Sequence, residues 1–259
     1  MAKDILQELI ELSNRLGRPE MDYVILGEGN TSARVDNGSF YVKVSGAELR
    51  TADRSSFVRV SFERVLELLS TPDPGDQTVK QALMGAKLDP EASGHPSIET
   101  LLHALCLSLP GVEVVGHTHP TAVNAITCSI AFEQAFSGRV FPDEIVLCGP
   151  APVLVPYADP GIPLALAVKA RVEEYTDRYG ERPRIILLKN HGLIALGRSP
   201  RQVEEITLMA VKAARVLLGT YTLGGPRYLT EKDVQRIHTR PDEEFRRQQL
   251  GLDLRGQKD

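Results

Sequence analysis

Two histidines one residue apart close a short hydrophobic run in the segment VEVVGHTHPTAV, residues 112–123. The run is rich in valine and is bounded by prolines, which is typical of a β-strand. Side chains at positions i and i+2 of a strand point to the same face, so the imidazoles of His117 and His119 lie about 6–7 Å apart at the backbone and face the same way. This spacing suits two ligands of one metal ion, although a hydrogen-bonded histidine pair without a metal produces the same pattern.

A third histidine, His191, lies in the segment LLKNHGLIALG, again at the end of an apolar run. Gly192 follows it and is expected to let the backbone turn tightly. Three of the six histidines therefore end strands whose sequence indicates burial. Three neutral imidazoles with one open coordination position form a donor set of catalytic Zn²⁺ sites. The sequence thus predicts Zn²⁺, or another divalent metal, held by His117, His119 and His191.

A carboxylate for proton transfer is available at Glu99, in the segment HPSIETLLHALCLSLPG. Apolar residues at helical spacing and a final Pro-Gly pair predict a helix there. A helix that turns tightly into the following strand tends to pack back against it, which would bring Glu99 beside the histidines. A solvated surface glutamate is the alternative. His103, one helical turn later, is expected to orient this carboxylate rather than bind the metal, or simply to pack.

The segment GEGNTSARV has the composition of an anion cradle, because its glycines leave backbone N–H groups accessible and its polar residues add side-chain donors. A strand rather than a helix is expected to follow it, and the lysine of a P-loop is missing, so neither nucleotide-binding motif is indicated. The segment VSGAEL supplies a second turn of small residues. Each segment could also be a plain turn. The candidate donors are Gly27, Gly29, Asn30, Thr31, Ser32, Ser45 and Gly46.

Other patterns predict the elements that position these residues. Helices are expected in KDILQELIELSNRLG, in IPLALAVKARVEEYTDRYG and in SPRQVEEITLMAVKAARVLLG, where Ser199 would cap the N-terminus. Strands are expected in FYVKVSG, FVRVS, EIVLCG and PVLVPY and on both sides of Asn190. Residues 72–95 favour a solvated loop with a short helix near Val79–Leu88. No linker divides the sequence, so we expect one α/β domain over residues 1–259, with helices packed on a mixed or largely antiparallel sheet.

The composition is that of an ordinary globular protein, with 42% hydrophobic residues, 25% charged residues and a net charge of −4. This balance gives no electrostatic reason to expect nucleic acid or an anionic membrane as a partner. The sequence shows no apolar run of about 20 residues, which a membrane span needs, and no pattern of a secretory leader. The expected location is therefore the cytoplasm. Cys106, Cys128 and Cys148 lie in apolar stretches at unrelated spacings and are expected to be reduced core thiols.

Taken in order, the segments GEGNTS, VSG, PSIETLLHA, GHTHP, VPYA and LLKNHGLIALG resemble the class II aldolase/adducin family over about residues 5–225. Within the family, the sequence looks most like the zinc-dependent aldolases of fuculose phosphate and rhamnulose phosphate. The resemblance implies a three-layer α/β/α fold with a central mixed, largely antiparallel sheet. It also implies a cyclic homotetramer with active sites at the subunit interfaces. Residues 226–259 would then form a C-terminal tail.

The resemblance also implies a role for each matching position. His117, His119 and His191 fall on the zinc ligands, and Glu99 falls on the catalytic acid/base carboxylate. The phosphate-binding positions correspond to Gly29, Asn30, Ser45, Gly46 and Ser97.

The sequence departs from the fuculose-phosphate pattern at two points. Ile98 stands where those enzymes have a second serine before the glutamate, so one phosphate-binding hydroxyl is missing. The tyrosine that those enzymes contribute from a neighbouring subunit has no counterpart in FEQAFSGRVF. Candidate replacements for this proton donor are Asp143, Glu144 and Tyr228.

The reaction that the resemblance implies is cleavage of a ketose phosphate into dihydroxyacetone phosphate and a small aldehyde through a metal-stabilised enediolate. The aldehyde would be lactaldehyde or glycolaldehyde. A sugar-phosphate 4-epimerase or dehydratase on the same metal site is an alternative, and a non-enzymatic adducin-like binding module is another. The three retained histidines and Glu99 favour an enzyme whose partner is a small sugar phosphate.

Overall fold

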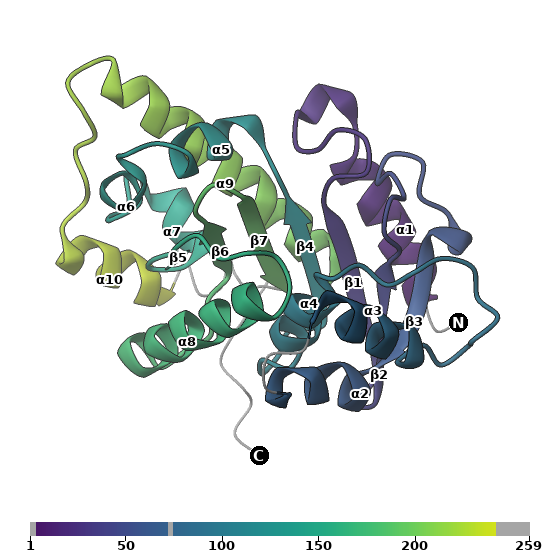
Figure 1. The fold of residues 1–259 in the computed structure, drawn as a ribbon. Helices are drawn as coiled ribbons and strands as arrows, with labels where there is room; N and C mark the ends of the chain where they lie inside the picture. Colours follow the sequence, from purple (N-terminus) through teal and green to yellow (C-terminus); the bar gives the residue numbers. More distant parts are fainter. Residues whose placement is uncertain (1–3, 72–74, 242–259) are drawn as a thin grey trace.

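A computed structural model describes residues 4–71 and 75–241 and contains one sheet of seven strands in these ranges (Figure 1). The strand order is β3-β2-β1-β4-β7-β6-β5. Neighbouring strands run antiparallel except for the pair β5 and β6, which is parallel. The prediction of a mixed, largely antiparallel sheet is therefore confirmed. The strands are β1 (Asn30–Asp36), β2 (Ser39–Lys43), β3 (Phe57–Ser61), β4 (Val114–Thr118), β5 (Val153–Val155), β6 (Ile185–Leu188) and β7 (Gly192–Gly197).

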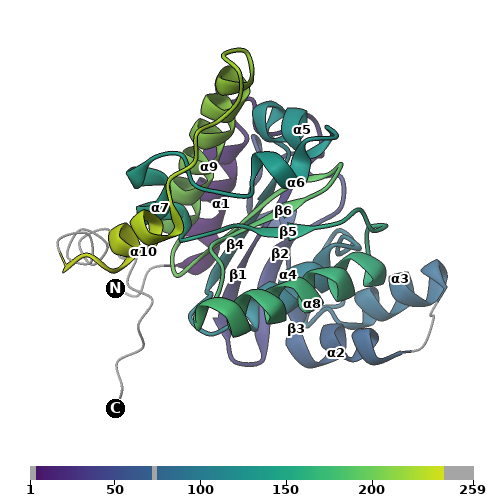
Figure 2. The same ribbon diagram turned by 90° about the vertical axis from the view of Figure 1, so that its left-hand side faces the viewer.

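Helices cover both faces of the sheet, which gives the expected three layers (Figure 2). One face carries α2 (Phe62–Glu67), α3 (Asp76–Gly85), α4 (Thr100–Leu107) and α8 (Ile162–Tyr179). The other face carries α1 (Ile5–Leu16), α5 (Thr121–Thr127), α6 (Phe132–Ala135) and α9 (Pro200–Tyr221), with α7 (Pro142–Cys148) and then α10 (Glu231–Thr239) packed beyond α9. Three short 3₁₀ helices are η1 (Pro19–Met21), η2 (Arg54–Ser56) and η3 (Leu68–Ser70).

Alternate residues of the central strands pack into the hydrophobic layers on opposite faces of the sheet. In β4, Val114 packs into the layer formed with α1 and α9, while Val115 packs into the layer formed with α4 and α8. Ile185 and Ile186 of β6 divide in the same way. Because both faces are buried, these strands appear in the sequence as continuous apolar runs rather than as alternating ones.

Three of the expected elements differ in the structure. The segment EIVLCG, predicted as a strand, is the helix α7. A short apolar run does not distinguish a strand from a buried helix by its periodicity, and here Pro142 at the first helical position and acidic residues in the first turn decide the outcome. A strand was expected to follow the segment GEGNTSARV, but β1 already begins within it, at Asn30. The short helix expected near Val79–Leu88 begins earlier and is α3.

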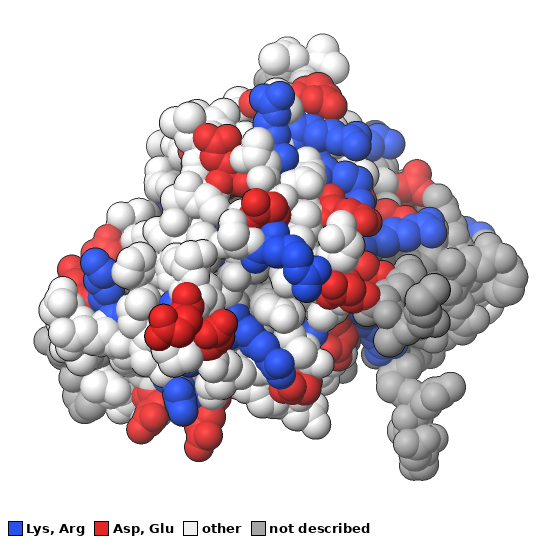
Figure 3. Space-filling view, turned by 90° about the vertical axis from the view of Figure 1, so that its right-hand side faces the viewer, with Lys and Arg blue, Asp and Glu red and all other residues white. Residues whose placement is uncertain are grey.

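The cysteine prediction holds for two residues of three. Cys106 and Cys148 are buried, whereas Cys128 is exposed because it follows the last residue of the short helix α5. Over residues 4–71 and 75–241, no helix combines the length and apolar composition that crossing a membrane requires. On the face drawn in Figure 3, acidic and basic side chains are interspersed and do not gather into a patch of one sign.

Candidate metal centre and its carboxylate

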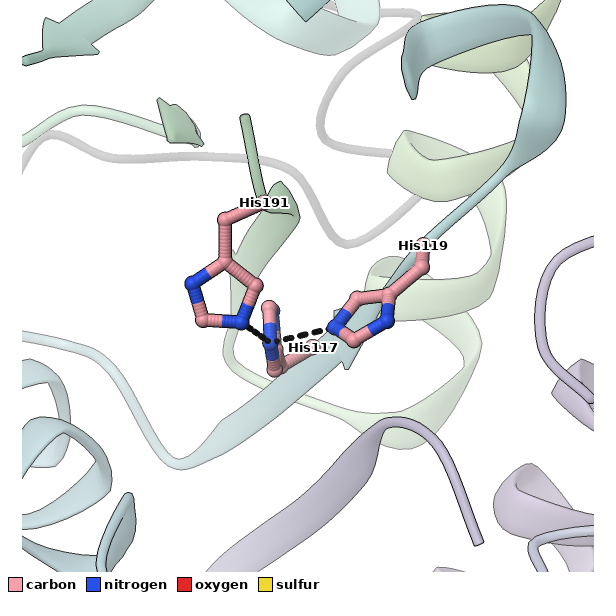
Figure 4. A group of neighbouring side chains, drawn as sticks. All are labelled: His117, His119 and His191. Carbon is pink, nitrogen blue, oxygen red and sulfur yellow. Dashed lines mark hydrogen bonds between the residues drawn. The ribbon is translucent and has the colours of Figure 1, made fainter. Parts of the chain in front are cut away.

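The three predicted histidines converge at one end of the sheet (Figure 4). His117 lies in β4, His119 follows the end of that strand, and His191 lies in the turn between β6 and β7. The antiparallel pairing of β4 with β7 brings the end of the first strand beside the start of the second. The Nε2 atom of His117 lies 3.0 Å from Nε2 of His119 and 3.3 Å from Nε2 of His191. One nitrogen from each ring can therefore contact a single metal ion.

Two glycines make room for this convergence. A Cβ atom on Gly192 would lie 2.5 Å from the carbonyl oxygen of Thr118 and 2.7 Å from Cδ2 of His119. A Cβ atom on Gly29 would lie 2.7 Å from the carbonyl oxygen of His117. The left-handed residue of the β6–β7 turn is Asn190, with φ of 56°, so Gly192 is needed for close packing rather than for the turn as the sequence suggested.

The hydrogen bonds of His117 orient its ring for metal binding. Its Nδ1–H donates to the carbonyl oxygen of Leu193 at 3.0 Å, which leaves the lone pair of Nε2 pointing to the centre of the cluster. Burial and the neighbouring imidazoles lower the pKa of His119 to about 3. Burial acts in the same direction on the pKa of His117, but the Glu99 carboxylate outweighs it and raises that pKa. His119 is thus neutral, which is the form that binds a metal.

Glu99 faces the same cluster, as the sequence predicted, although it is the N-cap residue of α4 and not part of the helix. Its Oε1 atom lies 3.2 Å from Nε2 of His191 and 3.5 Å from Nε2 of His117. Burial raises the pKa of this carboxyl group, but the two imidazoles more than offset that effect and hold the pKa well below its usual range. Glu99 is therefore an ionised carboxylate beside the imidazole nitrogens.

A directed chain of hydrogen bonds holds the other oxygen of Glu99. The hydroxyl of Ser32 donates to Nδ1 of His103 at 2.6 Å, and Nε2–H of His103 donates to Oδ1 of Asn30. The amide of Asn30 then donates to Oε2 of Glu99 at 2.5 Å. Complete burial lowers the pKa of His103 to about 3, so this imidazole stays neutral. His103 therefore orients Glu99 through Asn30 and not through direct contact.

The candidate phosphate-binding segments lie close together beside this chain. Asn30 is paired with His117 across β1 and β4, and its amide is already bonded to Glu99 and His103. The backbone N–H of Ser45 donates to the carbonyl oxygen of His95, two residues before Ser97. The hydroxyl of Ser97 accepts from the backbone N–H of Glu99 at 3.3 Å. Gly46 has φ of 80°, and a Cβ atom at this position would meet no other atom within 4 Å.

A buried lysine joins two of these segments and was not recognised from the sequence. Nζ of Lys43 lies 3.4 Å from the carbonyl oxygen of Gly27 and 2.5 Å from that of Ala47. Burial lowers the pKa of Lys43 to about 8, and the charge of Glu99 opposes part of that shift. In the segment FYVKV, Lys43 alternates with apolar residues and resembles a solvent-facing strand position, so its burial had no sequence signal.

Two of the three candidate proton donors are bonded to groups outside the histidine cluster. Glu144 is buried in an ion pair with Arg139, at 2.7 Å. The hydroxyl of Tyr228 donates to the carbonyl oxygen of Gln134 at 2.7 Å. Asp143 lies in the first turn of α7.

Residues 7–218 match the family model described as the class II aldolase and adducin N-terminal domain. The 3-oxo-tetronate 4-phosphate decarboxylase of Haemophilus influenzae is 26% identical over 237 residues, which cover 89% of this chain and 96% of the relative.

Solved structures share the fold. The N-terminal class II aldolase domain of a conserved protein from Thermoplasma acidophilum has a TM-score of 0.66 and 25% identity, covering 84% of this chain and 95% of that one. An L-fuculose 1-phosphate aldolase has a TM-score of 0.70 and 17% identity, covering 95% of this chain and 98% of that one. The latter likeness concerns the fold alone.

Proposed function

The chain belongs to the class II aldolase and adducin family, and from this premise we propose that it is a metal-dependent lyase. It breaks the bond between the carbon adjacent to the carbonyl group and the next carbon in a small phosphorylated sugar or sugar acid. The observation that carries this proposal is the convergence of three imidazole Nε2 atoms beside the Glu99 carboxylate, which lies 3.2 Å from His191. A cluster of this kind has the donors for a metal and a base for proton transfer in one place.

His117, His119 and His191 would hold one Zn²⁺ ion or another divalent metal. The donor set fits, because three imidazole nitrogens leave an open position for a substrate oxygen. The outer nitrogen of His117 is also bonded to a backbone carbonyl, as is usual for a ligating histidine. When bound, the metal supplies a Lewis acid that stabilises negative charge on the substrate oxygens.

Glu99 would hold and deliver the proton at the reacting carbon. Breaking the bond leaves an electron pair on the carbon beside the carbonyl group, and this carbon must be protonated to give the product. The carboxylate is oriented by Asn30, so it can accept a proton and return it without first changing its position. Its 12% exposed side chain limits exchange of that proton with bulk water.

The phosphate group would bind to Gly29, Asn30, Ser45, Gly46 and Ser97. Lys43 lies behind two of these segments, and its buried positive charge makes the local potential favourable for an anion. Anchoring the phosphate in this way would convert binding energy into orientation of the reacting carbon.

Two reactions fit this site and lead to the same product. Aldol cleavage of a ketose phosphate gives dihydroxyacetone phosphate and a small aldehyde such as lactaldehyde or glycolaldehyde. Decarboxylation of a 3-oxo-tetronate 4-phosphate, the substrate in the name of the Haemophilus influenzae relative, releases its carboxyl carbon as CO₂ and leaves dihydroxyacetone phosphate. In both reactions the electron pair remains on the same carbon, where Glu99 would deliver the proton.

The contacts of the proton-donor candidates favour decarboxylation as the second candidate. Aldol cleavage needs a group that removes the hydroxyl proton of the departing aldehyde, whereas a carboxylate leaves as CO₂ without giving up a proton. Glu144 is held in a buried ion pair and the Tyr228 hydroxyl is bonded to a backbone carbonyl, so neither is available in the described arrangement. Asp143 or a group from a second subunit would restore the aldol reaction.

Product analysis tests this proposal. Zinc-loaded protein is incubated with ketose 1-phosphates and 3-oxo acid 4-phosphates, and a coupled assay follows dihydroxyacetone phosphate. Release with CO₂ would identify a decarboxylase, and release with an aldehyde would identify an aldolase. If none of these substrates yields dihydroxyacetone phosphate, the proposal is wrong.

A further inference from the structure

We infer that Glu28 is a positioning residue for the metal centre, whose carboxylate accepts a hydrogen bond from the outer ring nitrogen of His119. This bond would fix the imidazole ring and make its inner nitrogen a better metal ligand. The inference rests on the proposed function, in that the three histidines must bind a metal.

The two nitrogens of His119 face different groups. Nε2 lies at the centre of the cluster, 3.0 Å from Nε2 of His117. Nδ1 points outward and lies 3.9 Å from Oε2 of Glu28. Glu28 is therefore on the opposite side of the ring from the metal position, where it can act on the metal only through His119.

The chain around Glu28 keeps its carboxylate on this side of His119. Oε2 of Glu28 accepts a hydrogen bond from the backbone N–H of Ile25 at 3.0 Å. The backbone N–H of His119 donates to the carbonyl oxygen of Tyr23 at 2.9 Å. Residues 23–28 thus contact both the backbone and the ring of this histidine. The side chain of Glu28 is 40% exposed and is not packed in place, and a hydrogen bond to Nδ1 requires the 3.9 Å separation to shorten to about 3 Å.

His117 already makes the kind of hydrogen bond that we infer between His119 and Glu28. Its outer nitrogen already donates to the carbonyl oxygen of Leu193, at 3.0 Å. Ligating histidines usually donate their second N–H to a carbonyl or carboxylate group, which fixes the tautomer and raises the basicity of the ligating nitrogen. A bound divalent cation also carries two positive charges, of which Glu99 offsets one. A carboxylate at Glu28 would offset the second.

Zinc affinity tests this role directly. We expect Glu28→Gln to bind Zn²⁺ about 10–100-fold more weakly than the unaltered protein in competition with a coloured chelator, because outer-shell partners of metal-binding histidines have effects of this size. Glutamine removes the charge but keeps an oxygen that accepts from Ile25, so the local backbone bond survives. Glu20→Gln, an exposed glutamate in η1, is the matched control and should bind zinc normally.

Ring N–H resonances supply a second measurement that a purely structural role would not change. In the zinc-loaded protein, the Nδ1–H proton of His119 should appear far downfield and move upfield in Glu28→Gln, while that of His117 stays in place. Zinc binding by Glu28→Gln within twofold of the unaltered protein, or unchanged ring resonances, would overturn the inference and leave the metal site standing. If the unaltered protein does not bind zinc, the proposed function fails and this inference fails with it.

Discussion

Glu99 lies between two sets of groups that act on it differently. The imidazoles on one side keep its pKa low, and the amide of Asn30 on the other side fixes its orientation. A carboxylate with a fixed orientation is suited to proton transfer. A purely structural ion pair is a poor explanation for Glu99, because the imidazoles that stabilise its charge are also the proposed metal ligands.

Replacing Glu99 by glutamine should separate proton transfer from metal binding. The change is nearly isosteric, and the amide oxygen can still accept from Asn30, so the fold and the three-histidine cluster should persist. The loss of the base should lower turnover by about 10²–10⁴-fold. Metal content by elemental analysis and turnover with excess zinc measure the two effects. Turnover near that of the unaltered protein would show that Glu99 is not the base.

His103 predicts a pH dependence of stability in the metal-free protein. Its pKa is lowered to about 3 in the folded state by complete burial, whereas an unfolded chain has a histidine pKa of about 6.5. Below pH 6.5, His103 therefore binds a proton in the unfolded state but not in the folded state. The free energy of unfolding is unaffected by this titration above pH 6.5 and decreases as the pH falls toward 3. The loss is about 1.4 kcal/mol per pH unit.

The variant His103→Gln removes this titration and so isolates its effect. Urea unfolding in EDTA should give a free-energy difference between the two proteins that shrinks by about 2 kcal/mol between pH 7 and pH 5. Parallel pH profiles for the two proteins would contradict the assignment of a neutral buried imidazole.

The candidate site was predictable in part because some of its residues come from short contiguous segments. The spacing of His117 and His119 in one strand, and the position of His191 at the end of another, were visible as local patterns. The contacts of Lys43, Glu28 and Asn30 were not, because they depend on which loops meet after β1, β2 and β4 pair. Sequence periodicity indicates which face of a helix or strand a residue occupies. It does not indicate which residue of another element will contact that face.

At the scale of elements, the approach of β7 to β4 sets the geometry of the cluster, and Gly192→Ala should disturb it. The added Cβ would meet the carbonyl oxygen of Thr118 at 2.5 Å and the ring of His119 at 2.7 Å, so the two strands must separate. We expect a loss of zinc affinity together with a loss of about 1–3 kcal/mol of stability, as for other overpacked sites.

Gly219→Ala is the matched control for this variant, because its Cβ would meet nothing within 4 Å and it lies inside α9. That change should leave zinc affinity alone and raise stability by about 0.5–1 kcal/mol. Chelator competition and thermal unfolding test both variants. Normal zinc affinity in Gly192→Ala would show that the cluster tolerates a shift of β7.

At the scale of the whole molecule, we propose one domain over residues 1–259, because all strands of the described ranges join one sheet. The tail expected at residues 226–259 contains α10, which packs on α7, and its residues 242–259 lie outside the described ranges.

We also propose that the chain forms a homotetramer with active sites at its interfaces. Ile25 and Leu26, which are 64% and 76% exposed, belong to the loop that contacts His119, so apolar surface beside the site is available for a second subunit. Light scattering should give a mass four times the 28.4 kDa of one chain. A monomer at micromolar concentration would contradict interfacial active sites.

Hydrogen exchange into dihydroxyacetone phosphate isolates the proton transfer assigned to Glu99. Aldol cleavage and decarboxylation both end with protonation of the same carbon, so the reverse of that single step does not depend on which reaction the protein performs. Zinc-loaded protein in D₂O should replace one carbon-bound hydrogen of the hydroxymethyl group of dihydroxyacetone phosphate, as followed by proton NMR, and Glu99→Gln should not. Absence of exchange in the zinc-loaded, unaltered protein, or equal exchange in Glu99→Gln, would show that Glu99 does not transfer this proton.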